Sequence, residues 1–76
     1  FGSVIVNANP PGHVYVDGEY LGPTPLAGYP LNAGRHRIRI QPIAGEASDY
    51  GPLSTQFELG PFEWNKRLGP FSLPPK

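Results

Sequence analysis

The 76-residue chain has no cysteine and no excess of charge of either sign. Without cysteine it can have neither a disulfide bond nor a cysteine-ligated zinc site. Lysine and arginine together number 6, as do aspartate and glutamate, so the formal net charge is zero. Bulk nucleic-acid binding requires a clear positive excess, so we expect no nucleic-acid partner.

Long segments free of glycine and proline are also missing. Ten glycines and eleven prolines make up more than a quarter of the chain, and no run without them exceeds seven residues. A proline inside a helix costs about 3 kcal/mol and a glycine about 1 kcal/mol, whereas a strand needs only about 5–6 residues. The composition therefore predicts an all-β domain.

No apolar run is long enough to cross a membrane, and we expect no direct membrane insertion. No signal peptide is visible. The chain does not begin with methionine, so we expect a processed chain or a part of a longer protein.

Apolar and polar residues alternate in several short segments, as is typical of half-buried strands. These segments are residues 3–8, 13–17, 35–41, 53–59 and 62–68. Asp17-Gly18 predicts a tight hairpin turn, because such a turn needs positive φ angles that glycine accepts and aspartate tolerates. The two prolines of residues 22–26 lack a ladder donor, so we expect this segment to cross between sheets or to run along an edge. We interpret residues 42–52 as a loop.

The pattern predicts a small antiparallel β-sandwich of about five to seven short strands. We expect the domain to span residues 1–70, followed by a tail, linker or short edge strand at residues 71–76. The predicted core consists of Val4, Val6, Val14, Val16, Leu26, Ile38, Ile40, Phe57, Leu59 and Trp64.

Five motifs in the first forty residues resemble the PEGA domain family. They are GSVIV at 2–6, PPGH at 10–13, VYVDGEY at 14–20, GPTPL at 22–26 and AGRHRIRI at 33–40. Pro11 and His13 depart from the family pattern, which has Glu and Ala there, and Tyr50 follows a longer loop than the family's Gly-Tyr. The resemblance implies a small β-sandwich without catalytic activity, used as an accessory module in bacterial and archaeal envelope, surface-layer and secreted proteins.

The residues themselves give no sign of an active site or of a cofactor. The chain has no Gly-x-Ser-x-Gly elbow, and neither histidine has a nearby serine in a known arrangement. Neither 17–19 nor 46–49 has the alternating aspartates of a calcium loop. We interpret His36 as a half-buried histidine at the edge of the core, bonded to backbone; the alternative is a metal ligand paired with His13. We therefore predict no enzyme, no metal site and no cofactor.

The candidate binding residues are Arg35, Arg37, Arg39 and Tyr15. The three arginines alternate along one strand, which spaces them about 6.6 Å apart on one sheet face. One interpretation is a solvated face with cross-strand ion pairs. The acidic residues available for such pairs are Asp17, Glu19, Glu58 and Glu63. The other interpretation is a basic stripe for an anionic partner. Tyr15, Tyr20, Tyr29 and Tyr50 either form an aromatic platform for sugars, with Tyr15 the best candidate for exposure, or cover a thin core.

Our leading hypothesis is a non-catalytic accessory module of a bacterial or archaeal envelope or secreted protein, which mediates protein–protein docking or spacing. Its partner would be another envelope protein or further domains of the same longer chain. We expect it in the cell envelope or outside the cell, the periplasm included. The alternative is a module that binds an acidic cell-wall polysaccharide through the arginines.

Overall fold

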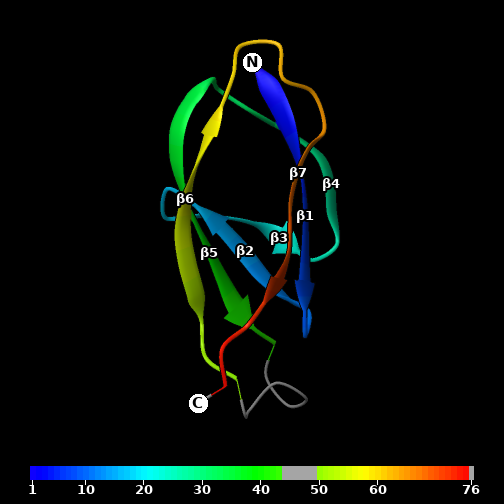
Figure 1. Cartoon of the computed structure of the whole chain (residues 1–76), viewed down its shortest axis with the longest axis vertical. Helices are drawn as coiled ribbons and strands as arrows, with labels where there is room; N and C mark the ends of the chain where they lie inside the picture. The colour runs from blue at the N-terminus through cyan, green and yellow to red at the C-terminus, as the bar shows by residue number, and fades with distance from the viewer. Residues whose placement is uncertain (44–49, 76) are drawn as a thin grey trace.

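The computed structural model describes residues 1–43 and 50–75 as two packed β-sheets (Figure 1). The strands are β1 (Gly2–Asn9), β2 (Gly12–Val16), β3 (Glu19–Pro23), β4 (Leu26–Leu31), β5 (Gly34–Pro42), β6 (Leu53–Leu59) and β7 (Lys66–Ser72). These seven strands, and the lack of helix in the described residues, confirm the prediction of an all-β sandwich. None of these residues forms a helix that could cross a membrane.

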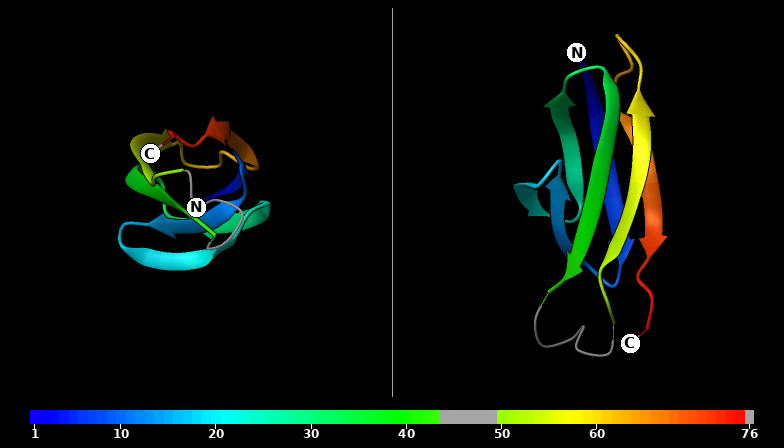
Figure 2. Two further views of the ribbon diagram at one scale, coloured as in Figure 1. Left: turned by 90° about the horizontal axis from the view of Figure 1, so that it is seen from below. Right: turned by 90° about the vertical axis from the view of Figure 1, so that its left-hand side faces the viewer.

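One sheet has three strands in the order β4-β1-β7, and the other has four in the order β3-β2-β5-β6 (Figure 2). All pairings are antiparallel except that of β1 with β7, which is parallel. The parallel pair arises because the chain leaves β6 beside the start of β1, where Val4 is the partner of Lys66. From there β7 runs in the same direction as β1.

The core lies between the two sheets, and its fully buried apolar side chains within the described residues are all aliphatic. Its buried residues are Val4, Val6, Val14, Val16, Ile38, Ile40, Leu59, Leu68 and Leu73. Seven of the ten predicted core residues are among them, and Leu26 and Phe57 are partly buried against them. The prediction for Trp64 was wrong, because its side chain is 60% exposed.

Residues 62–68 explain that error. The alternation predicted a strand with Phe62, Trp64 and Leu68 on its inner face, but β7 begins only at Lys66. Phe62 and Asn65 have φ angles of 73° and 56°. Positive φ at two positions breaks the two-residue alternation of an extended chain. Only Leu68 therefore reaches the core.

The turns and crossings of the first half were predicted correctly. Asp17 and Gly18 have φ angles of 53° and 84° and connect β2 to β3 in a tight hairpin. Residues 22–26 pass from the edge of the four-stranded sheet, where β3 lies, to the edge of the other, where β4 begins. Thr24 fixes this crossing, since its amide donates to the Gly12 carbonyl at 2.8 Å and its hydroxyl accepts the Gly12 amide at 3.0 Å.

The C-terminal residues contribute to the sandwich. Phe71 and Ser72 are part of β7, and Leu73 is buried. The Leu73 amide donates to the Asn9 carbonyl at 3.2 Å. Of the predicted loop 42–52, residues 44–49 lie outside the described residues, and the Gly51 amide donates to the Pro74 carbonyl at 2.7 Å.

Candidate functional site

The candidate binding residues lie on the outer face of the four-stranded sheet. Along β5, the exposed side chains of Arg35, Arg37 and Arg39 alternate with the buried Ile38 and Ile40. The apolar positions fix the direction of the arginines, because successive side chains of a strand point to opposite faces. The packing of the core therefore holds all three cations on one surface.

The sheet register sets the neighbours of each arginine. On β2, Tyr15 is the partner of Arg39. On β6, Glu58 lies opposite Arg35, whereas Gln56 and Ser54 lie opposite Arg37 and Arg39. The three arginines thus differ in environment: Arg35 faces an acidic residue, and the other two face neutral polar residues.

Within residues 1–43 and 50–75, none of the three arginines forms an ion pair. Arg39 instead donates from Nη2 to Gln41 Oε1 at 2.9 Å. Glu58 and Arg35 are register partners without coming into salt-bridge contact. The cross-strand ion pairs considered for the three arginines are therefore not formed within the described residues.

A hollow of about 800 Å³ lies over this face. It is lined by Tyr15, Asp17, Gly18, Arg37, Arg39, Gln41 and Ser54. The structure thus brings together three of the four candidate residues, Tyr15, Arg37 and Arg39, whereas Arg35 does not line the hollow.

An aromatic cluster adjoins the hollow. The ring centroids of Tyr15 and Tyr20 are 5.2 Å apart, and those of His13 and Tyr20 are 5.5 Å apart. The Tyr20 hydroxyl and His13 Nδ1 share a hydrogen bond of 3.0 Å. Of the four tyrosines considered for an aromatic platform, Tyr15 and Tyr20 are thus neighbours, as the two-residue turn at Asp17-Gly18 implies.

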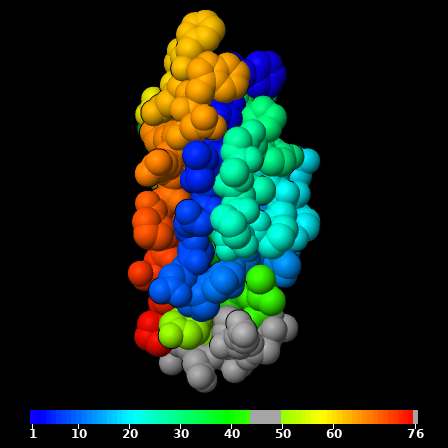
Figure 3. Space-filling model, turned by 90° about the vertical axis from the view of Figure 1, so that its right-hand side faces the viewer, coloured from blue at the N-terminus to red at the C-terminus, as the bar shows by residue number. Residues whose placement is uncertain are grey.

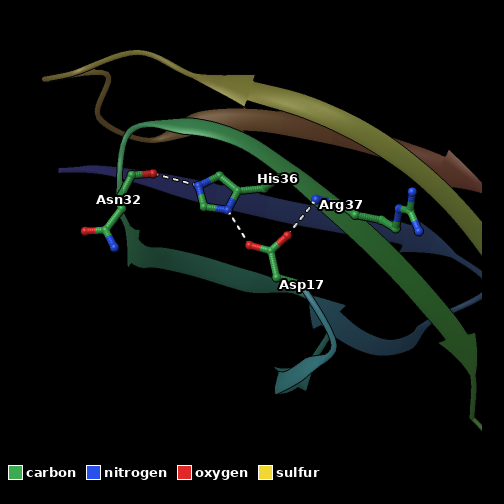
Figure 4. A network of polar contacts seen from close by, with 4 residues as sticks. All are labelled: Asp17, Asn32, His36 and Arg37. Atoms are coloured by element: carbon green, nitrogen blue, oxygen red, sulfur yellow. Dashed lines mark hydrogen bonds and ion pairs between the residues drawn. The ribbon is translucent and has the colours of Figure 1, made fainter.

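A second polar cluster joins the β2–β3 turn to β5 (Figure 4). Asp17 Oδ2 lies 2.6 Å from His36 Nδ1, and Asp17 Oδ1 accepts the Arg37 amide at 2.9 Å. His36 Nε2 lies 2.7 Å from the Asn32 carbonyl oxygen. We call Asp17, His36 and the Asn32 carbonyl the clasp. His36 is bonded to backbone at the edge of the core, as predicted, and it stacks on Phe57 with 5.4 Å between ring centroids.

The clasp favours a charged histidine. A carboxylate oxygen and a carbonyl oxygen are both acceptors, so both ring nitrogens of His36 must donate, which only the imidazolium can do. Burial lowers the pKa of His36, but the bonds to Asp17 and to the Asn32 carbonyl, together with the charge of Asp17, outweigh it and raise the pKa above its ordinary value. The Arg37 amide, followed by His36, lowers the pKa of Asp17.

The clasp also engages the carboxylate that lines the hollow. Asp17 lines it, but both of its carboxylate oxygens are already bonded, to the Arg37 amide and to His36. The Arg37 guanidinium extends away from Asp17 (Figure 4). Asp17 is therefore a positioning residue of the turn, and the guanidinium groups of Arg37 and Arg39 remain available to an external anion.

The two histidines do not come together as a metal site, since His13 bonds Tyr20 and His36 bonds Asp17. No group of three or more potential metal-ligating side chains occurs in the part of the chain that the structure describes.

The fold and this face define a small β-sandwich module with a basic, partly aromatic surface. A family model for the PEGA domain matches residues 1–64, from the start of β1 into the loop after β6. The chain belongs to this family, whose members are non-catalytic accessory domains. Neither the curated proteins nor the solved structures include a match.

Proposed function

We propose that this PEGA domain is an accessory module that docks an acidic partner through the outer face of the four-stranded sheet. The observation that supports this most directly is the pair of guanidinium groups, Arg37 and Arg39, beside Tyr15 in one hollow without an ion pair in the described residues. Arginine binds carboxylates bidentately, and arginine and tyrosine are enriched among residues that dominate protein interfaces.

The partner that we propose is an acidic protein surface, either of another envelope protein or of a further domain of the same longer chain. A sheet face suits such docking because its backbone is fixed by the ladder on both sides of β5. Little ordering of the arginine-bearing strand is then required on binding. We propose the cell envelope or the extracellular space as the location.

An acidic polysaccharide is the second candidate. It is favoured by Tyr15, which lies beside Arg37 and Arg39 in the hollow and has Tyr20 next to it. An aromatic ring offers an apolar face to a sugar ring, while a guanidinium binds the sugar carboxylate. The two partner classes share the arginines and differ in their need for Tyr15.

Titration calorimetry of the 76-residue chain with two acidic probes, polyglutamate and polygalacturonate, tests both candidates. We expect salt-sensitive binding of at least one probe and a loss of tenfold or more in the Arg37→Gln/Arg39→Gln variant, since interface residues that matter contribute about 1 kcal/mol or more each. The matched control, Lys66→Gln/Arg67→Gln, removes two cations outside the hollow and should bind as the wild type does.

The pattern of losses separates the candidates. Binding of polygalacturonate that also falls in Tyr15→Ala supports the polysaccharide. Binding of polyglutamate that is insensitive to Tyr15→Ala supports the protein surface. Equal losses in the two double variants, or no binding of either probe at low salt, would refute an anion-binding face.

A further inference from the structure

The loop between β6 and β7 exposes two large aromatic side chains. Phe62 is 82% exposed and Trp64 is 60% exposed. We call these two residues the aromatic tip. In Figure 3 the yellow to orange segment of the chain forms the apex of the molecule, beside the blue N-terminal end.

Hydrogen bonds fix the backbone of this loop. The Ser3 amide donates to the Glu63 carbonyl at 3.0 Å, and the Asn65 amide donates to Ser3 Oγ at 2.7 Å. The Phe62 amide donates to the Phe1 carbonyl at 3.0 Å. The Glu63 side chain closes the loop, because its Oε1 accepts the Gly60 amide at 2.9 Å. The fold therefore fixes the position of the aromatic tip.

The loop holds the backbone of Phe62 in an energetically unfavourable conformation. Its φ of 73° lies in the left-handed region, which an aromatic residue rarely adopts. Such strain persists only where the surroundings impose it, typically at functional positions. Here the strained residue is also the most exposed large apolar side chain of the described residues. Strain and exposure together indicate a contact surface.

The dimensions of the molecule restrict what can cover this tip. The domain measures 37 × 18 × 18 Å, and the tip stands at one end of the long axis (Figure 1). The end of the molecule is thus its narrow side, whereas a stable protein interface buries roughly 800 Å² on each partner and would have to extend beyond the loop onto the neighbouring strands. A second copy of the chain or another globular protein is therefore poorly matched to the tip alone.

A lipid bilayer does not require a wide interface from each contacting loop. Aromatic side chains, tryptophan above all, concentrate at the headgroup level, where the ring meets both apolar and polar surroundings. The charges of Glu63 and Lys66, which flank Trp64, compensate each other: Lys66 Nζ lies 3.6 Å from Glu63 Oε1 and donates to the Glu58 carbonyl at 2.7 Å. The loop thus offers aromatic rings with little net charge to repel any lipid.

We propose that the aromatic tip inserts shallowly into the interfacial region of a lipid bilayer. Sequence reasoning predicted no direct membrane insertion from the absence of a spanning segment, but shallow contact by Phe62 and Trp64 needs none. In this orientation the long axis of the sandwich points away from the bilayer surface. The basic face lies along its side, free to bind an acidic partner.

Trp64 makes the test specific, because it is the only tryptophan of the chain. We expect its fluorescence to shift to the blue when the 76-residue chain is mixed with phosphatidylcholine vesicles, and to be quenched by brominated phosphatidylcholine. Phe62→Asn should weaken the partition coefficient about tenfold, since burial of a phenylalanine contributes about 1.5 kcal/mol or more. Asparagine tolerates positive φ, so this variant keeps the loop conformation.

Tyr20→Asn is the matched control, because Tyr20 is 49% exposed but lies on the sheet face. It should partition like the wild type, as should the Arg37→Gln/Arg39→Gln variant, and added salt should have little effect. These controls distinguish the tip from the basic face, whose binding is salt-sensitive.

Three results would overturn the proposal. The first is an unshifted Trp64 spectrum with vesicles, which would favour a pocket in a protein as the occupant. The second is equal partition of Phe62→Asn and wild type. The third is a molecular mass that, without lipid, rises with protein concentration for the wild type but not for Phe62→Asn. Such a result would show self-association through the tip.

Discussion

His36 Nδ1 donates to Asp17 Oδ2 over 2.6 Å and thereby joins strand β5 to the β2–β3 turn. The side chain of His36 is 11% exposed and that of Asp17 is 54% exposed, so the pair lies where the protein meets water. The stability that it contributes must therefore depend on pH through both groups, in opposite directions.

For His36, the pKa is raised in the folded protein, so its contribution is complete below the ordinary value of 6.5 and is lost as the pH rises through the folded pKa. For Asp17, the pKa is lowered, so its contribution is complete above 3.8 and is lost as the pH falls through the folded pKa. The clasp should stabilise the fold most between these two ordinary values.

Urea denaturation across this range checks the prediction. We expect His36→Gln to lower the free energy of unfolding by about 0.5–1 kcal/mol at pH 5 and by less above neutrality. His13→Gln is the control, because His13 bonds a tyrosine hydroxyl and, among the residues that the structure describes, no carboxylate. A difference between His36→Gln and wild type that stays constant with pH would show that the histidine acts by packing on Phe57 alone.

Gly12 should not tolerate a side chain. A Cβ atom there would lie 2.7 Å from the Gln41 carbonyl oxygen and 2.7 Å from Ile40 Cγ2. The carbonyl is held in the β5 ladder, so it cannot move aside, and overpacking of this kind costs about 1–3 kcal/mol. Gly12→Ala should lower the melting temperature accordingly. At Gly51, where the nearest atom of the described residues beyond its chain neighbours lies at 3.9 Å, alanine should be almost neutral.

Ser3 should be needed for the geometry of the aromatic tip. It is 5% exposed, and its Oγ accepts the Asn65 amide at 2.7 Å. Ser3→Ala leaves that amide without its partner, at a cost of about 1–3 kcal/mol. Calorimetry should show the loss of stability, and the amide resonance of Asn65 should exchange faster with solvent. Ser72→Ala, at an exposed position of β7, should change neither quantity.

Most of the first half of the fold could be predicted because its signals are local, although β4 (Leu26–Leu31) was not among the predicted strands. The Asp17-Gly18 turn, the two prolines of residues 22–26 and the alternation in β5 each constrain the backbone where they occur. The face on which Arg35, Arg37 and Arg39 lie follows from the same alternation. Whether this face is free to bind a partner does not follow from the alternation, because it depends on where Asp17 and Glu58 direct their side chains.

The second half departs from prediction because its determinants are distant in sequence. The loop that exposes Phe62 and Trp64 is held by Ser3, which is 62 positions from Asn65. The parallel pairing of β1 with β7 likewise depends on the path of the chain over the end of the sandwich. The same local alternation that identified β5 therefore failed for residues 62–65, where positive φ angles at Phe62 and Asn65 reverse the direction of the side chains.

The three arginines should differ in their contribution to binding an acidic partner. Arg37 and Arg39 line the hollow with Tyr15, whereas Arg35 does not and lies opposite Glu58 in the register. The Asp17 carboxylate also lines the hollow, but its oxygens are bonded to His36 and to the Arg37 amide, whereas Glu58 beside Arg35 forms no ion pair within the described residues. Arg37→Gln and Arg39→Gln should each weaken polyglutamate or polygalacturonate binding several-fold more than Arg35→Gln does. Each substitution removes one positive charge, so simple long-range attraction would give three equal losses in calorimetry. Unequal losses in the predicted order would mean that the hollow, and not the net charge of the stripe, makes the contact.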